Sequence, residues 1–191
     1  MGMKLPASVL AALQQGRTGN LTPPRKVRVL GIDTSLRSTG VGIIDAEGSA
    51  LKYIDCRPIK NPASRPLSAC LLNLCETLHA YLDEFHPDEV AIEGIFYCKN
   101  VRTTLILGQA RGALISVCAR AALPLFEYPP TKVKQAVTGT GTATKDQIQR
   151  MMMRSLSLQT LPQEDAGDAL AIAITHIHNR SSIAALAPKP L

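Results

Sequence analysis

Four acidic side chains in three separate segments could act together as a metal site. Asp33 and Glu93 each end an apolar run, VRVLGID and DEVAIE, and Asp165 and Asp168 lie three residues apart at the start of a predicted helix. A carboxylate at the end of a buried strand is costly unless a positive charge compensates it. Carboxylates packed together also raise one another's pKa values, and a divalent cation relieves that repulsion. Because no His or Cys cluster accompanies them, we predict that they bind Mg²⁺, with Mn²⁺ as a substitute.

The chemistry that such a site supports is hydrolysis at phosphorus. Two ions about 3.5–4 Å apart can clamp an in-line displacement, one activating water and the other stabilising the leaving 3′ oxygen. The first turn of a helix also favours acidic residues for electrostatic reasons, so Asp165 and Asp168 alone could be capping residues. Because two strand ends also contribute carboxylates, the metal site is favoured over helix capping, and we predict that it holds two ions.

The charges are distributed unevenly along the chain. Residues 99–154 carry nine basic and two acidic side chains, whereas residues 29–98 carry five basic and ten acidic ones. A polyanion could bind the basic part while metal occupies the acidic part. Ordinary solvated surface is the alternative interpretation of the charge pattern.

Two lysines and one aromatic residue are candidate nucleic-acid contacts. Lys134 lies in a segment, 131–143, that is predicted to be a glycine-rich loop facing phosphate, and Lys145 begins the helix that follows. Backbone amides at a helix start combine with lysine to bind phosphate. Phe96 follows the strand that carries Glu93, and on an exposed loop it could stack on a base. A core position for Phe96 is the alternative.

The periodicity of the chain predicts an α/β fold in which these side chains meet. The pattern predicts three antiparallel strands, at residues 27–33, 41–45 and 50–56. A proline-containing loop is predicted at 57–66. An amphipathic helix, 67–85, then leads to a strand at 88–93. A right-handed crossover places that strand parallel to the first, so Asp33 and Glu93 would end neighbouring strands.

The second half of the chain adds helices and one more strand. A long helix is predicted over 100–122, a fifth strand over 125–128, and helices over 145–156 and 164–178. The expected sheet is therefore five-stranded and mixed, with three antiparallel strands, then two parallel ones, flanked by helices. Gly108 and Gly112 lie four apart on the long helix. They suggest close approach by another backbone, in this chain or in a second copy.

Length and composition indicate one domain with tails. The 191 residues divide into a flexible basic extension (1–26), one folded domain (27–179) and a C-terminal tail (180–191). No apolar run reaches the roughly 18 residues of a membrane span. The five cysteines form no CxxC pair, which favours reduced thiols in a cytoplasmic protein.

Five segments in order resemble the RuvC family of Holliday junction resolvases: GID, AIEGIFYCKN, LGQARGALI, VKQAVTGTGTATKDQIQ and EDAGDALAIAITH. The resemblance covers about residues 28–178. It implies an RNase H-like fold and a homodimer. It also implies Mg²⁺-dependent symmetric cutting of four-way DNA junctions to leave 5′-phosphates, in recombination and repair. The RuvA–RuvB branch-migration complex is the partner that it implies.

The resemblance also assigns roles to the candidate residues. It matches the four carboxylates to the family's catalytic acids, Lys134 and Lys145 to its DNA-contacting lysines, and Phe96 to its aromatic residue at the junction. Two departures stand near the site. Thr34 and Ser35 replace the usual Pro-Gly, and Gly94 replaces the usual Gln or Glu.

Three other functions compete with this interpretation. Another RNase H-like nuclease acting on RNA or on an RNA–DNA hybrid would use the same carboxylates, and the preferred substrate would distinguish it. An actin-like ATPase or sugar kinase is suggested by GIDTS followed by TG, but it needs two similar domains and ATP binding. A junction-binding module without cleavage would not need intact carboxylates.

Overall fold

The computed structural model describes residues 26–94, 100–180 and 190–191. Phe96 lies outside the described residues, and so do the predicted N-terminal extension apart from Lys26 and most of the predicted C-terminal tail. The elements in chain order are β1 (Val27–Asp33), β2 (Ser38–Glu47), β3 (Ala50–Lys60), α2 (Leu67–Phe85), β4 (Glu89–Glu93), α3 (Val101–Arg120), β5 (Leu125–Tyr128), α4 (Pro130–Thr138), α5 (Lys145–Ser155) and α6 (Glu164–Arg180).

The five strands form one mixed sheet in the order β3-β2-β1-β4-β5. The β1–β2 and β2–β3 pairs are antiparallel, whereas β1–β4 and β4–β5 are parallel. The predicted fold class is therefore confirmed. Ile32 pairs with Ile92 across β1 and β4, so the next residues, Asp33 and Glu93, end neighbouring strands at one edge of the sheet, as the crossover argument expects.

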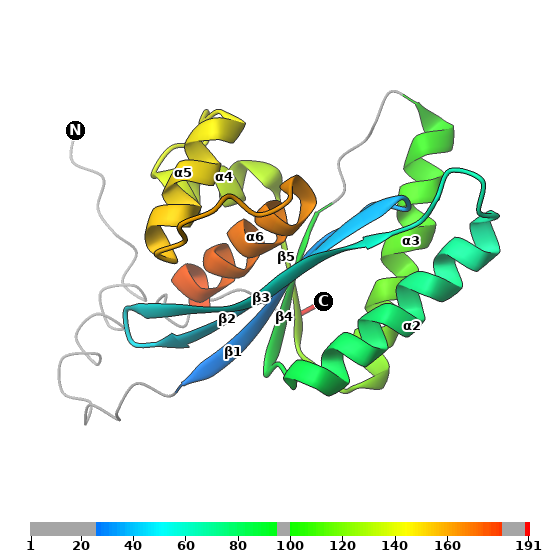
Figure 1. Cartoon of the computed structure of the whole chain (residues 1–191), viewed down its shortest axis with the longest axis horizontal. Coiled ribbons are helices and arrows are strands. Elements are labelled where there is room, and N and C mark those ends of the chain that lie inside the picture. The colour runs from blue at the N-terminus through cyan, green and yellow to red at the C-terminus, as the bar shows by residue number, and fades with distance from the viewer. Residues whose placement is uncertain (1–25, 95–99, 181–189) are drawn as a thin grey trace, which may run out of the picture.

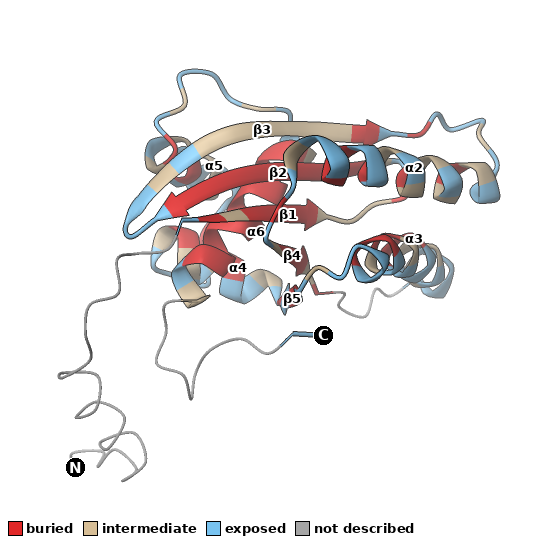
Figure 2. Ribbon diagram, turned by 90° about the horizontal axis from the view of Figure 1, so that it is seen from below, coloured by how far each residue is buried: buried red, intermediate tan, exposed pale blue. Residues whose placement is uncertain are grey.

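Helices cover both faces of the sheet. In Figure 1, α4, α5 and α6 lie on one face and α2 and α3 on the other. The alternation of side chains along the strands divides the core accordingly. Leu30 and Ile32 pack with the α2–α3 layer, while Val29 packs with the α4–α6 layer. Figure 2 shows β1 and β2 buried along most of their length and β3 more exposed, as an edge strand should be.

Glycines allow α6 to approach the sheet closely. A Cβ atom on Gly31 would stand 1.9 Å from the carbonyl oxygen of Ala169, and one on Gly40 would stand 1.9 Å from the carbonyl oxygen of Asp165. No real side chain fits at such distances, so glycine is required at both positions. This close packing places the first turn of α6, with its two aspartates, against β1 and β2.

The third strand is longer than the pattern predicts. β3 continues through Arg57, Pro58 and Ile59 to Lys60, so the start of the predicted loop at 57–66 is wrong. Proline is tolerated because β3 is an edge strand and pairs only with β2. β2 likewise extends beyond its predicted ends, to Ser38 and Glu47.

The predicted phosphate-facing loop at 131–143 is mostly a helix, and this prediction is wrong. Pro130 occupies the first turn of α4, where its missing N–H costs nothing, and Val133 and Val137 bury one face. Gly139 ends the helix in the left-handed conformation, with φ of 84°. Lys134 therefore projects from a helix rather than from a glycine-rich loop.

The remaining helix predictions agree with the structure to within a few residues. Thr144 and Gln147 form a capping box at the start of α5. A Cβ atom on Gly108 or on Gly112 would meet nothing within 4 Å, so the described residues of this chain supply no close approach to that face of α3.

The structure also bears on the predicted state of the cysteines and on the predicted lack of a membrane span. The cysteines in the described ranges, Cys56, Cys70, Cys75 and Cys118, are free thiols. No helix in the described part of the chain is long and apolar enough to span a bilayer.

Candidate active site

Three of the predicted carboxylates and both predicted lysines line one cavity of about 290 Å³. Asp33 comes from the end of β1, Glu93 from the end of β4 and Asp168 from the first turns of α6; Lys134 of α4 and Lys145 of α5 complete the polar lining. Apolar residues form the rest of the wall: Pro130, Val133, Ile148, Ala171 and Ile172. Acidic groups from three elements thus share a partly desolvated space with two cations.

Asp165 lies one turn before Asp168 and outside the cavity lining. Its carboxylate accepts a hydrogen bond from the hydroxyl of Ser38, at the start of β2. Sequence reasoning missed Ser38. No motif marks it, because its proximity to Asp165 follows from the close approach of α6 to Gly40.

Lys145 links the cavity to the start of α6. Its ammonium group contacts Asp168 at 3.0 Å and also forms an ion pair with Glu164. Burial lowers the pKa of Lys145, but its bonds to these two carboxylates raise the pKa to about 12 overall. Lys145 is therefore a permanent cation beside the cavity. Glu164 is a second residue that sequence reasoning did not single out.

The carboxyl groups in the cavity are hard to ionise. The pKa of Asp33 is raised from 3.8 to about 7, chiefly by burial and then by the charges of Glu93, Asp168 and Asp165, while Lys145 opposes them. Burial is also the main cause that raises the pKa values of Glu93 and Asp168. A site with this much unfavourable negative charge would be stabilised by a cation of higher charge than lysine.

The residues present fit a hard divalent cation. Every acidic donor is a carboxylate oxygen, which Mg²⁺ and Mn²⁺ prefer. In the ranges that the structure describes, no three Asp, Glu, His or Cys side chains stand close enough together to hold a metal ion as they are placed. Asp33, Glu93 and Asp168 are the residues that would hold the ion from the cavity wall, with Asp165 adjacent.

The raised pKa of Asp33 predicts that the metal-free protein loses stability as the pH rises. The unfolded chain releases this proton near pH 3.8 and the folded chain only near 7, so the stabilising contribution is complete below about pH 4 and is lost by about pH 7. Thermal unfolding in EDTA from pH 5 to 8 would measure it. Asp33→Asn should flatten the profile, and an equally steep profile in that variant would contradict the assignment.

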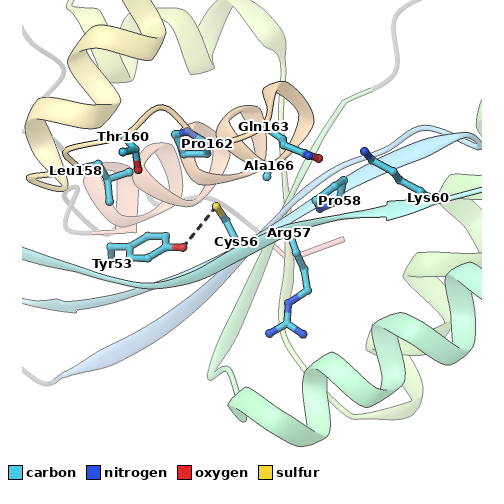
Figure 3. A pocket seen from close by; sticks show the side chains of 10 residues that line it. All are labelled: Tyr53, Cys56, Arg57, Pro58, Lys60, Leu158, Thr160, Pro162, Gln163 and Ala166. Atoms are coloured by element: carbon cyan, nitrogen blue, oxygen red, sulfur yellow. Dashed lines mark hydrogen bonds between the residues drawn. The ribbon is translucent and has the colours of Figure 1, made fainter.

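A larger cavity, of about 550 Å³, lies on the other side of the α6 N-terminus. Figure 3 shows it between β3 and the segment before α6, with the Tyr53 hydroxyl directed at the Cys56 thiol and Arg57 pointing away toward α2. No carboxylate lines this cavity. Its size therefore does not make it the catalytic site.

Known proteins are similar to this chain in both sequence and fold. The family model "Crossover junction endodeoxyribonuclease RuvC" matches residues 29–176. A RuvC from Rhodopseudomonas palustris is 45% identical over 166 residues, which are 86% of this chain and 95% of that protein. One from Chloroflexus aggregans is 42% identical over 158 residues, 82% of this chain and 96% of that protein.

Solved structures agree with the sequence comparison. "T. thermophilus RuvC in complex with Holliday junction substrate" superposes with a TM-score of 0.78 at 28% identity, covering 86% of this chain and 99% of that one. The yeast mitochondrial Holliday junction resolvase Ydc2, at 13% identity and a TM-score of 0.61, shares the fold. The fold is thus RNase H-like, as the resemblance implies, and the chain belongs to the RuvC family of crossover junction endodeoxyribonucleases.

Proposed function

We propose that this protein resolves four-way DNA junctions by paired symmetric nicks, with Mg²⁺ or Mn²⁺, leaving 5′-phosphate ends during recombination and DNA repair. The observation that carries the proposal is the cavity itself, in which Asp33, Glu93 and Asp168 face Lys134 and Lys145 in a chain of this family. Acidic groups for metal and basic groups for phosphate are the two requirements of phosphodiester hydrolysis.

The residues of the chain have separable roles in this mechanism. Asp33, Glu93 and Asp168, with Asp165 beside them, would hold two Mg²⁺ ions, which when bound supply Lewis acidity and an activated water. Lys134 and Lys145 attract and orient the scissile phosphate at the cavity wall. The apolar side chains between them exclude bulk water, which strengthens these electrostatic contacts.

The exposed face of α3 supports a homodimer. Val101 and Leu105 are 60% and 63% exposed, and Gly108 and Gly112 continue the same stripe with open space in front of them. Apolar and small residues at this spacing allow two helices to pack closely. The twofold axis of such a dimer would relate the cavities of the two copies, which suits a symmetric junction.

Two further assignments follow from the family. We infer that the RuvA–RuvB branch-migration complex is a partner, since junction resolution is expected to be coupled to branch migration. We also place the protein in the cytoplasm, because a DNA substrate and free thiols are compatible with a reducing compartment.

A labelled mobile four-way junction tests the function directly. With Mg²⁺ we expect nicks at symmetric positions on two strands of like polarity, and with EDTA none. A linear duplex of the same sequence should remain uncut. If the protein instead cuts an RNA–DNA hybrid and leaves the junction intact, it is a different RNase H-like nuclease and the proposal is wrong.

Lys134→Ala should weaken junction binding and reduce its salt dependence. Loss of one phosphate contact lowers the slope of log affinity against log salt by about 1. Gel-shift titrations in EDTA at several salt concentrations would measure the slope. Lys52→Ala removes the same charge from an exposed position on β3, away from the cavity, and should leave the slope unchanged. Equal slopes in wild type and Lys134→Ala would exclude this lysine as a contact.

A further inference from the structure

An ion pair lies on the face of the sheet opposite the catalytic cavity. Arg111 of α3 pairs with Glu127 of β5. The Arg111 side chain is 9% exposed, whereas that of Glu127 is 41% exposed. The pair therefore joins the α3 layer to the strand that neighbours β4.

The Glu127 side chain lies directly against Gly94, the residue that follows Glu93. A Cβ atom on Gly94 would stand 3.1 Å from Oε1 of Glu127, 3.3 Å from its Cδ and 3.4 Å from its Cγ. Glu127 thus fills the space in which a side chain at position 94 would project. The Gly94 N–H also donates to the carbonyl of Tyr128 at 2.8 Å, which continues the β4–β5 ladder beyond Glu93.

Glycine makes this support necessary. A residue without a side chain has the widest choice of backbone conformations, so the chain just after Glu93 is free to move unless its surroundings hold it. The described contacts that hold it are the Tyr128 carbonyl in the sheet and the Glu127 side chain on the α3 side. Arg111 in turn holds Glu127 in that position.

The pair is a poor device for stability alone. Burial lowers the pKa of Arg111, and its Nη1 has no hydrogen-bond partner in the described part of the chain. Desolvation of the buried Arg111 charge offsets part of its attraction to the half-exposed Glu127 carboxylate. A costly pair beside a catalytic carboxylate is better explained by the geometry that it imposes.

We propose that Arg111 and Glu127 are positioning residues that orient Glu93 by bracing Gly94 from the α3 side. The inference rests on the proposed role of Glu93 as a metal ligand. The Arg111–Glu127 pair thus supports the metal site from outside the cavity. Arg111 lies on α3, the helix whose exposed face is proposed to pack against a second copy of the chain. Movement of α3 would then be transmitted to Glu93 through three contacting residues.

The test compares variants that remove the brace with one that preserves its shape. Arg111→Met combined with Glu127→Ala removes both charges together, so no unpaired charge remains buried. Mn²⁺ affinity, measured without DNA from the electron paramagnetic resonance of the free ion, should fall about 10–100-fold, as for other groups that orient metal ligands. Junction cleavage should fall with it. Circular dichroism should report a folded protein.

Two matched variants separate positioning from charge and from stability. Glu127→Gln keeps the side chain against Gly94 and keeps an acceptor for Arg111. Its Mn²⁺ affinity should therefore stay within about threefold of wild type, a smaller change than the loss expected for the double variant. Arg57→Met with Glu84→Ala removes a more exposed pair, of 3.3 Å, between β3 and α2 and should change nothing at the site.

Three results would overturn the inference. The first is wild-type Mn²⁺ affinity in the Arg111→Met/Glu127→Ala protein, and the second is an equal loss in Glu127→Gln. The third is an unfolded double variant, which would make the pair structural. Failure of the wild-type protein to bind Mn²⁺ would instead contradict the proposed function. Failure of the positioning inference can therefore be distinguished from failure of the proposed function.

Discussion

Asp33→Asn is expected to abolish junction cleavage and to leave junction binding intact. Asp33 ends β1 at the cavity wall, and its charge is the most strongly opposed of the acidic groups there, with a pKa of about 7. Asparagine has nearly the same shape but a neutral, weaker oxygen donor. Because loss of groups that merely orient a metal ligand costs about 10–100-fold, loss of the ligand should exceed 100-fold in the single-turnover cleavage rate.

The control for this prediction is another aspartate exchanged in the same way. Asp83→Asn removes the charge of a side chain on α2 that is 69% exposed, pairs with His79 and does not line the cavity. It should cleave at the wild-type rate. Junction binding by the wild type, Asp33→Asn and Asp83→Asn, measured by gel shift in EDTA, should agree within about twofold, since neither exchange removes a lysine that is proposed to contact phosphate. Normal cleavage by Asp33→Asn would show that the proposed metal site is wrong.

Gly31→Ala is expected to destabilise the protein more than any conservative change in the hydrophobic core. The new methyl group would stand 1.9 Å from the carbonyl oxygen of Ala169 and 2.9 Å from the amide nitrogen of Ala173. Both are helix backbone atoms, so α6 as a whole must move away from β1. Overpacking usually costs 1–3 kcal/mol, and because backbone must shift here we expect about 3 kcal/mol or more.

Gly167→Ala makes the same chemical change where there is room. The nearest atom to its Cβ position would be the Cε of Met152, at 3.5 Å, which is ordinary van der Waals contact. Alanine inside a helix is favoured over glycine by about 0.5–1 kcal/mol, so this variant should be slightly more stable. Urea unfolding of both variants would measure the difference. Similar midpoints would mean that α6 does not depend on glycine at position 31.

The order of the strands could be predicted because it depends on local pattern and chain connectivity. Three β-rich runs separated by short turns must pair antiparallel, and a helix between two strands imposes a right-handed crossover. These rules place Asp33 beside Glu93 without any knowledge of the packing. The helices are predictable from the spacing of apolar residues, and Thr144 caps the start of α5.

Local signals are ambiguous in two segments. Pro58 suggests a loop, but an edge strand leaves one side of its backbone unpaired and accepts proline. Gly139 and Gly141 indicate a loop for all of 131–143, whereas Pro130 begins a short helix that Gly139 ends, and Val133 and Val137 bury one face of it. In both cases the tertiary setting of the segment decided its structure.

The sequence by itself determined the chemistry that this protein can perform. It contains the four carboxylates, the basic segment with Lys134 and Lys145, and the motifs that indicate the family. Side-chain type and spacing are local properties, and strand order follows from connectivity. Metal-dependent phosphodiester hydrolysis is therefore predictable from the sequence.

Only the tertiary structure decided how the site is arranged and supported. It placed Asp168 in the cavity and Asp165 against Ser38, and it joined Arg111 to Glu127 behind Gly94. These contacts join segments that are far apart in the chain, and their distances depend on how closely whole elements pack. Glycine at positions 31 and 40 permits that packing, but only the folded chain shows which backbone atoms meet there.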